Sequence, residues 1–366
     1  MELNFFEFPG NFNCEQLRLA RIASGYSLSE IGEALGVTRQ YAHRLENGAT
    51  PSKEQLSELS QILNVSEAFF FGSRKKPIEV DQCHFRSLRS STMTLKKMVM
   101  AQVEIFEDNF LRLLNEEVEF PEVKLLVAED LDISSVNLIE QIAERFRRET
   151  GLGLGPISNA VRFCESIGCL VLDLADADEK IDAFSIFNHR PLIVRNSSKQ
   201  SPGRQRFDVA HELGHLLMHQ GIETGCRKTE EQANNFASAF LMPRISFSSE
   251  FPQMRGQYFN WSVLEDMKVR WGVSLKAIIY RASKLGLISP EKAASGFTYL
   301  SRSGQTREEN GDERLSLERP TVIQKAIDIL DYSTWRTLIT QSGLNEFTLT
   351  QRYTLKVPQP HLRIVE

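Results

Sequence analysis

The chain has 366 residues, of which 41% are hydrophobic and 25% are charged, and its formal net charge is −5 at pH 7. This length exceeds what one hydrophobic core usually serves, so two or more domains are expected. No apolar run approaches the roughly 20 residues that span a bilayer, which excludes a membrane span. The negative charge argues against a protein that coats nucleic acid non-specifically.

The N-terminus and the cysteines predict a cytoplasmic protein. The first residues lack the basic start, apolar middle and small-residue cleavage site of a signal peptide. The cysteines are odd in number and scattered, and no two form a CxxC pair: Cys14, Cys83, Cys164, Cys169 and Cys226. This pattern suits a reducing compartment better than a disulfide framework.

Residues 14–72 predict a compact set of short helices. Ser27 and Glu30 have the spacing of a capping box, and the helix that they begin is expected to end at Gly36. Thr38 caps the next helix, which runs to about residue 47, and Ser52 opens another. Apolar residues at helical spacing form the expected core: Leu17, Ala20, Ile31, Leu35, Val37, Leu45, Leu56, Leu59, Ile62 and Leu63.

A linker, a long helix and a small sheet are expected next. Residues 72–77 combine glycine, proline and charge, which disfavours a packed element. Residues 90–117 have the pattern of one long helix, and 157–167 of a shorter one. Three segments rich in Val, Ile and Phe predict the strands of the sheet: 169–174, 181–187 and 192–195.

The rest of the chain is predicted to be mostly helical. The helix candidates are 202–219, 229–241, 261–269, 274–285 and 320–341, and Pro243 ends the second of them. Residues 301–313 are polar and low in apolar residues, which predicts a linker or a mobile loop. The last twenty residues are ambiguous.

The segment from His211 to His215, with the sequence HELGH, indicates a metal site. Residues four apart lie on one face of a helix, so His211 and His215 can reach the same ion. Glu212 lies beside the first histidine and can move a proton to and from water, which is why this spacing recurs in zinc peptidases. The alternative is a surface helix that contains two histidines by chance. The chain has only seven histidines, so such a match is rare.

A third ligand has to come from elsewhere, because a catalytic zinc site uses three protein ligands and one open position. Gly221 stands where the metzincin pattern needs a histidine. Glu230 is the preferred candidate, since it begins a helix whose alanines allow close packing, and Asn234 one turn later could donate a hydrogen bond to a ligand. Glu231 and His219 remain alternatives; for His219 we favour contact with free carbonyls at the helix end.

Residues 204–219, 230–237 and 241–243, together with 271–281, resemble the ImmA/IrrE family of bacterial metallopeptidases. The resemblance covers roughly residues 180–290. It implies Zn²⁺ held by His211, His215 and Glu230, with Glu212 as the catalytic acid and base, in a zincin-like, gluzincin-type domain. Family members cleave, or promote cleavage of, helix-turn-helix repressors.

Residues 14–72 resemble the Xre-type helix-turn-helix family, in residues 17–21, 26–48 and Pro51. In such a module the second helix of the motif enters the major groove, so Thr38, Arg39, Gln40 and His43 would face DNA and Arg44 or Arg18 would meet phosphates. Two features weaken this expectation. Leu28 stands where the family often has Gln, and the first 78 residues carry no excess of Lys and Arg over Glu. The same module could instead bind a protein.

These resemblances predict an α+β chain with four parts. They are an all-α helix-turn-helix domain (1–75), a helical connector (76–128), a zincin-like metallopeptidase domain with a small sheet (129–300), and a linker with a helical C-terminal region of unknown role (301–366). The predicted function is a DNA-binding regulator that cleaves a repressor-like protein in a stress or mobile-element response. The expected partners are operator DNA, that substrate and a second copy in a homodimer. The alternative is a transcription factor or antitoxin-like regulator whose peptidase-like domain is a non-catalytic sensor or interaction module.

Overall fold

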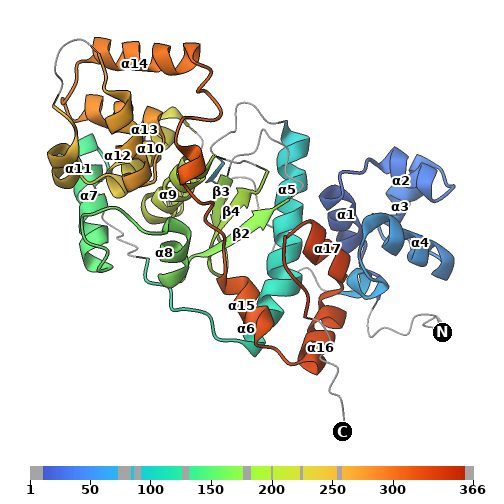
Figure 1. Ribbon diagram of the computed structural model, residues 1–366. Helices are drawn as coiled ribbons and strands as arrows, with labels where there is room; N and C mark the ends of the chain where they lie inside the picture. Colours follow the sequence, from blue (N-terminus) through green and yellow to red (C-terminus); the bar gives the residue numbers. More distant parts are fainter. Residues whose placement is uncertain are drawn as a thin grey trace, which may run out of the picture.

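The computed structural model describes residues 11–72, 84–85, 92–125, 132–175, 183–198, 201–222, 226–253 and 258–358. A small sheet lies at the centre of these residues. The N-terminal helices lie at one end of the molecule, the helices α12 to α14 lie at the other, and the long helix α5 stands between the sheet and the N-terminal helices (Figure 1). No helix among the described residues has the length and apolar character needed to cross a membrane.

The N-terminal helices begin where the sequence predicts. The Ser27 hydroxyl accepts from the Glu30 N–H at 3.2 Å, and the Glu30 carboxylate accepts from the Ser27 N–H at 2.7 Å, which completes the capping box. Thr38 caps the following helix. The predicted core residues are buried except Val37 and Ile62, which are partly buried. The elements are α1 (Cys14–Ala23), α2 (Leu28–Ala34), α3 (Arg39–Leu45), α4 (Lys53–Leu63) and the 3₁₀ helix η1 (Glu67–Phe71).

The helix predicted over 90–117 is confirmed as one continuous helix in three parts. α5 (Met93–Ile105) passes into a π-helical segment, η3 (Phe106–Leu111), and then into α6 (Arg112–Glu117). Phe106 and Phe110 are fully buried, and the Gln102 amide donates to the carbonyl of Ala23 in α1 at 2.9 Å. The connector helix therefore shares a core with the N-terminal helices.

The sheet has four strands in the order β1-β3-β4-β2. β2 (Leu170–Leu174), β3 (Ala183–Phe187) and β4 (Pro191–Asn196) confirm the three predicted strands, and β1 (His84–Phe85) is a fourth that the sequence analysis did not predict. β3 pairs antiparallel with both β1 and β4, and β2 runs parallel to β4. Alternate side chains enter two different cores, because successive residues of a strand face opposite sides.

The second core lies on the sheet face that carries Val171 and Ile193, and it is built mainly from helices. Five of them confirm predicted helices: α8 (Ala160–Ser166), α9 (Pro202–Met218), α10 (Arg227–Leu241), α12 (Trp261–Trp271) and α13 (Leu275–Lys284). Three others were not predicted: α7 (Val136–Glu149), α11 (Arg244–Glu250) and α14 (Pro290–Arg302).

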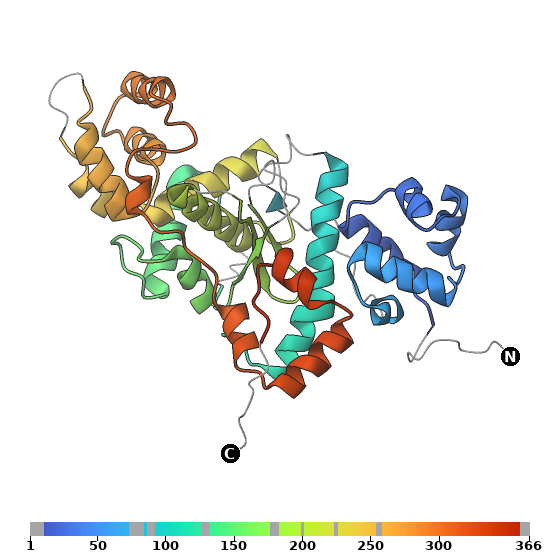
Figure 2. The same ribbon diagram turned by 45° about the vertical axis from the view of Figure 1, so that its right-hand side comes forward.

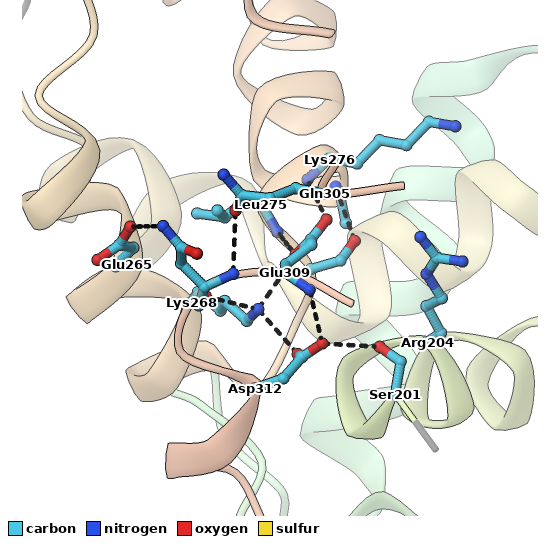
Figure 3. Close-up of polar contacts among 12 residues, drawn as sticks. Ser201, Arg204, Glu265, Lys268, Leu275, Lys276, Gln305, Glu309 and Asp312 are labelled. Atoms are coloured by element: carbon cyan, nitrogen blue, oxygen red, sulfur yellow. Dashed lines mark hydrogen bonds and ion pairs between the residues drawn. The ribbon is translucent and has the colours of Figure 1, made fainter. Parts of the chain in front are cut away.

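The loop predicted over 301–313 is confirmed for residues 303–311, but buried ionic contacts anchor it, so it is not a linker. Residues 301 and 302 end α14, and Glu309 is buried with its carboxylate 3.2 Å from Lys268 Nζ. Asp312 reaches the same ammonium group at 2.8 Å, and its other oxygen lies 3.5 Å from the hydroxyl of Ser201 at the start of α9 (Figure 3). These buried ionic contacts fix the segment, which ends in the short 3₁₀ helix η4 (Asp312–Arg314).

The C-terminal region packs against the N-terminal helices. The helix predicted over 320–341 is divided into α15 (Val322–Asp328) and α16 (Tyr332–Ser342), and α17 (Glu346–Gln351) follows. Leu344 forms an isolated antiparallel bridge with Val65, and the Ser66 N–H donates to the Gly343 carbonyl at 2.8 Å. Both views show α16 and α17 beside the connector helix (Figures 1 and 2). We call residues 343–348 the C-terminal clamp.

Candidate metal centre

The candidate metal centre lies where α9 and α10 pack closely. Gly214 of α9 faces α10, and a Cβ atom at this position would lie 2.9 Å from the ring of Phe236. Ala233 and Ala237 of α10 are fully buried, as the sequence analysis expected of them. The small residues of both helices therefore bring the side chains of one helix within reach of those of the other.

His211, His215 and Glu230 form a group in which one ligand atom of each lies within 4.8 Å of the others. The two Nε2 atoms are 3.1 Å apart, and the Glu230 carboxylate oxygens lie 3.4 Å from His211 Nε2 and 3.5 Å from His215 Nε2. Two imidazoles and a carboxylate are a donor set that suits zinc. Among the described residues, no other group of this kind occurs. The residues present thus fit a zinc ion.

The alternative third ligands lie outside this group. The Glu231 side chain is exposed on α10. His219 is fully buried, and its Nδ1 lies 2.9 Å from Nδ1 of His215, on the opposite side of that ring from Nε2. Within the described part of the chain, His219 does not make the expected contact with free carbonyls; its Nε2 instead lies 3.1 Å from the Gln232 amide oxygen.

Asn234 contacts His211, but not in the way that the sequence analysis expected. Its Oδ1 lies 3.1 Å from His211 Nδ1, so the asparagine accepts a hydrogen bond and the histidine donates it. A neutral imidazole carries one proton, and placing it on Nδ1 leaves the Nε2 lone pair directed at the ligand group.

Glu212 is fully buried next to the ligand group, on the side of the sheet. The Ser185 hydroxyl of β3 donates to Oε2 of Glu212 at 2.8 Å, which orients the carboxylate. Ser185 was missed by the sequence analysis. The available signal was weak: it is the one hydroxyl residue in the otherwise apolar strand Ala183–Phe187.

The charges of the group follow from its geometry. Burial favours the neutral acid of Glu230, but the contacts with His211 and His215 outweigh this effect and lower the pKa of the Glu230 carboxyl below its usual value. Burial, together with the neighbouring His215, lowers the pKa of His219 to about 4. Glu230 is therefore a carboxylate and His219 a neutral imidazole at neutral pH.

The candidate DNA-contacting residues lie together on the exposed side of α3 and its cap. Ala42 and Leu45 face the core, and the predicted residues are exposed: Thr38, Arg39, Gln40, His43 and Arg44. The guanidinium of Arg44 lies over the ring of Tyr41, 5.1 Å from its centre. The basic residues Arg74, Lys75 and Lys76 lie outside the described residues.

Comparison with known proteins finds similarity in two segments of the chain. Residues 164–283 match the family model for the IrrE N-terminal-like domain, and residues 17–70 match the model for the helix-turn-helix. The chain is also 40% identical over 57 residues to uncharacterized HTH-type transcriptional regulators of Sinorhizobium medicae and Rhizobium meliloti. The match covers 15% of this chain and 41% of each relative. The chain thus joins a helix-turn-helix domain of the Xre-like type to an IrrE N-terminal-like domain, and the second contains α9 and α10.

Proposed function

We propose that the protein is a DNA-binding transcriptional regulator with zinc-dependent endopeptidase activity. The observation that carries the proposal is the convergence of His211, His215 and Glu230 beside the buried carboxylate of Glu212. The three converging residues would hold zinc, which when bound supplies a Lewis acid for a peptide carbonyl and lowers the pKa of water. Glu212, oriented by Ser185, takes a proton from the attacking water and delivers it to the leaving amine.

The sheet edge beside Glu212 supports a substrate in extended form. β3 carries Ser185, and peptides commonly add to a sheet edge by backbone hydrogen bonds. In this structure β1 occupies that edge, with His84 opposite Ser185. A substrate would pair with β3 in place of β1. The similarity to the ImmA/IrrE family supports a repressor-like regulatory protein as the substrate, in a stress or mobile-element response.

Incubation of the purified protein with candidate repressor proteins tests the peptidase. The wild-type chain should bind about one zinc ion and cleave, whereas Glu212→Gln should bind zinc, keep its fold and lose cleavage by a factor on the order of 10²–10⁴. Glu231→Gln is the matched control, because Glu231 is an exposed acid on the neighbouring helix. Unchanged cleavage by Glu212→Gln would refute the peptidase.

DNA binding is tested by gel-shift titration with fragments from the neighbourhood of the gene. Arg39→Ala and Gln40→Ala should weaken binding by about 1–3 kcal/mol each, while Lys97→Ala, an exposed residue of α5, should not. Wild-type affinity should fall steeply between two salt concentrations, because phosphate contacts release counterions. An affinity independent of salt would instead indicate a protein partner for this domain.

The alternative is a regulator whose peptidase-like domain senses or binds without catalysis. One observation favours it: His211, Glu212 and His215 have no exposed surface, whereas a substrate backbone has to reach them. Normal operator control by the Glu212→Gln protein, with no cleavage by the wild-type chain, would establish this alternative.

A further inference from the structure

A line of hydrogen bonds leaves the metal-ligand group on its buried side. It begins at His215, whose Nδ1 lies 2.9 Å from Nδ1 of His219. His219 Nε2 lies 3.1 Å from Oε1 of Gln232, and the Gln232 amide nitrogen donates to the carbonyl of Ile133 at 2.8 Å. His215 and His219 have no exposed surface, and Gln232 is 7% exposed.

The direction of each hydrogen bond follows from the end of the line. A backbone carbonyl only accepts, so the amide nitrogen of Gln232 faces Ile133 and its oxygen faces His219. That oxygen also only accepts, so the His219 proton is on Nε2. An imidazole that carries one proton and donates it from Nε2 accepts at its other nitrogen, so Nδ1 of His219 is the acceptor in its contact with His215. The His215 proton is therefore on Nδ1, and the lone pair on Nε2.

The helix geometry explains why His219 is needed in this line. Successive residues of an α-helix are about 100° apart, so Gln232 lies roughly 200° around α10 from Glu230 and faces away from the ligand group. His219 is the residue that directly follows α9, four positions beyond His215, and its side chain lies between His215 and Gln232. His211 needs no such bridge. Asn234 lies one turn beyond Glu230 on α10, and its side-chain oxygen accepts a hydrogen bond directly from His211.

We infer that His219 and Gln232 are positioning residues, which hold His215 in the tautomer whose Nε2 lone pair faces His211 and Glu230. The inference rests on the proposed zinc site. It extends that site to two residues that would not themselves bind the zinc ion. In the other tautomer of His215, an N–H bond would face the ligand group and exclude a cation.

The first test is zinc affinity, measured by competition with a chromogenic chelator. His219→Leu and Gln232→Leu should weaken zinc binding by about 10- to 100-fold, as loss of partners of metal-binding histidines commonly does. His219→Asn should restore most of the affinity, because its amide oxygen replaces Nδ1 as acceptor. The matched control is Gln220→Leu, since among the described residues the Gln220 amide donates to the carbonyl of Leu216 in α9 and to no part of this line. Affinity within about twofold of wild type in both leucine variants would overturn the inference.

The second test does not depend on zinc or on activity. In the metal-free protein, ¹⁵N-labelled imidazoles should show His215 protonated at Nδ1, and His219→Leu should give a mixture of both tautomers. A wild-type His215 protonated at Nε2 would overturn the inference, even if a leucine variant failed to fold. Failure of the proposed function looks different: the wild-type chain would show the expected tautomer and the leucine variants would lose zinc affinity as expected, but the wild-type chain would cleave nothing.

Discussion

Glu107 lies in the π-helical segment η3 of the connector helix, and only 2% of its surface is exposed. Burial raises the pKa of its carboxyl from 4.5 to about 8, the neighbouring charge of Asp108 adds to this effect, and the Asn188 amide opposes part of it. Between about pH 4.5 and pH 8 the folded chain therefore holds a proton that the unfolded chain has lost. The stability of the fold should decrease as pH rises through this window.

Replacement of Glu107 by Gln tests this pH dependence, because the amide is neutral at every pH. We expect the variant to be more stable than wild type at pH 8, by on the order of 1–3 kcal/mol, and close to wild type at pH 5. Thermal unfolding at both pH values measures the difference. Glu116→Gln, at an exposed position of α6, should change little at either pH. A stability gain of the same size at both pH values would contradict the prediction.

Residues with a local signal could be predicted from the sequence. His211 and His215 are four apart on one helix, so spacing alone predicted that they share a site. Glu230 was the preferred of three candidates, and the family resemblance supported it. Ser185 and Gln232 could not be found in this way. Their contacts with Glu212 and His219 join segments that only the folded chain brings together, and neither has a neighbour in the sequence that indicates its partner.

At the scale of elements, the buried ion pair under residues 309–312 should contribute strongly to stability (Figure 3). Glu309→Ala would leave Lys268, which has no exposed surface, with Asp312 as its carboxylate partner, and would remove the acceptor for the backbone N–H groups of Leu275 and Lys276. We expect a loss of about 3–5 kcal/mol in the free energy of unfolding, measured by denaturant titration.

The control for this prediction is an exposed ion pair of the same region. Arg314 and Asp266 lie 3.0 Å apart with side chains about half and two-thirds exposed, so Arg314→Ala should cost no more than about 1 kcal/mol. Equal losses in the two variants would show that the Lys268 contacts do not stabilise the segment.

The pairing of β1 with β3 makes a prediction for the proposed peptidase. An extended substrate has to displace β1 from the edge of β3. Replacing both His84 and Phe85 by Pro removes whichever N–H of β1 faces β3 and should therefore raise kcat/KM. Zinc affinity should not change. Peptidase assays beside chelator competition measure both quantities. A kcat/KM equal to that of wild type would show that β1 does not compete with the substrate.

Helices and strands were predicted where the sequence pattern is local and strong. Each element that was missed has its own reason. β1 has two residues, too few for an alternating pattern, and exists only through its pairing with β3. The fixed segment after α14 is polar because its anchor is an ion pair. α7 had a readable signal: Ser135 caps it, and Ile139, Ala143 and Phe146 are buried at helical spacing.

At the scale of the whole molecule, the C-terminal clamp depends on one glycine. Gly343 ends α16 with φ at 69°, and a Cβ atom there would lie 2.5 Å from Cα of Phe69 in η1. Gly343→Ala therefore combines left-handed strain with a backbone clash. We expect it to lower the free energy of unfolding and to increase hydrogen exchange in α4 and η1.

Gly286 provides a matched control, because it has φ at 71° and a Cβ atom there would meet nothing within 4 Å. Gly286→Ala should cost only the left-handed strain, about 1–2 kcal/mol, and Gly343→Ala about 1–3 kcal/mol more. Equal costs, with unchanged exchange in α4 and η1, would show that the clamp does not hold the N-terminal helices.

The predicted division into four parts gave the C-terminal region no role, because no motif in it indicates a partner. Its contacts are made by backbone groups, by hydroxyls such as that of Thr348, and by apolar residues that any globular protein carries, such as Leu344 against Val65. Contacts of this kind between distant segments leave no pattern in either segment. The division itself remains a prediction.

The clamp has a consequence for a chain that is cut between residues 72 and 92. Thr348 donates to the carbonyl of Asn64 at 2.7 Å, Gly343 accepts from Ser66, and Gln102 donates to Ala23, and none of these contacts needs the intervening peptide. The two fragments should therefore elute together in size exclusion and separate only in denaturant. Cleavage of this peptide alone would not release the helix-turn-helix domain. Release would also require the C-terminal helices to dissociate from it.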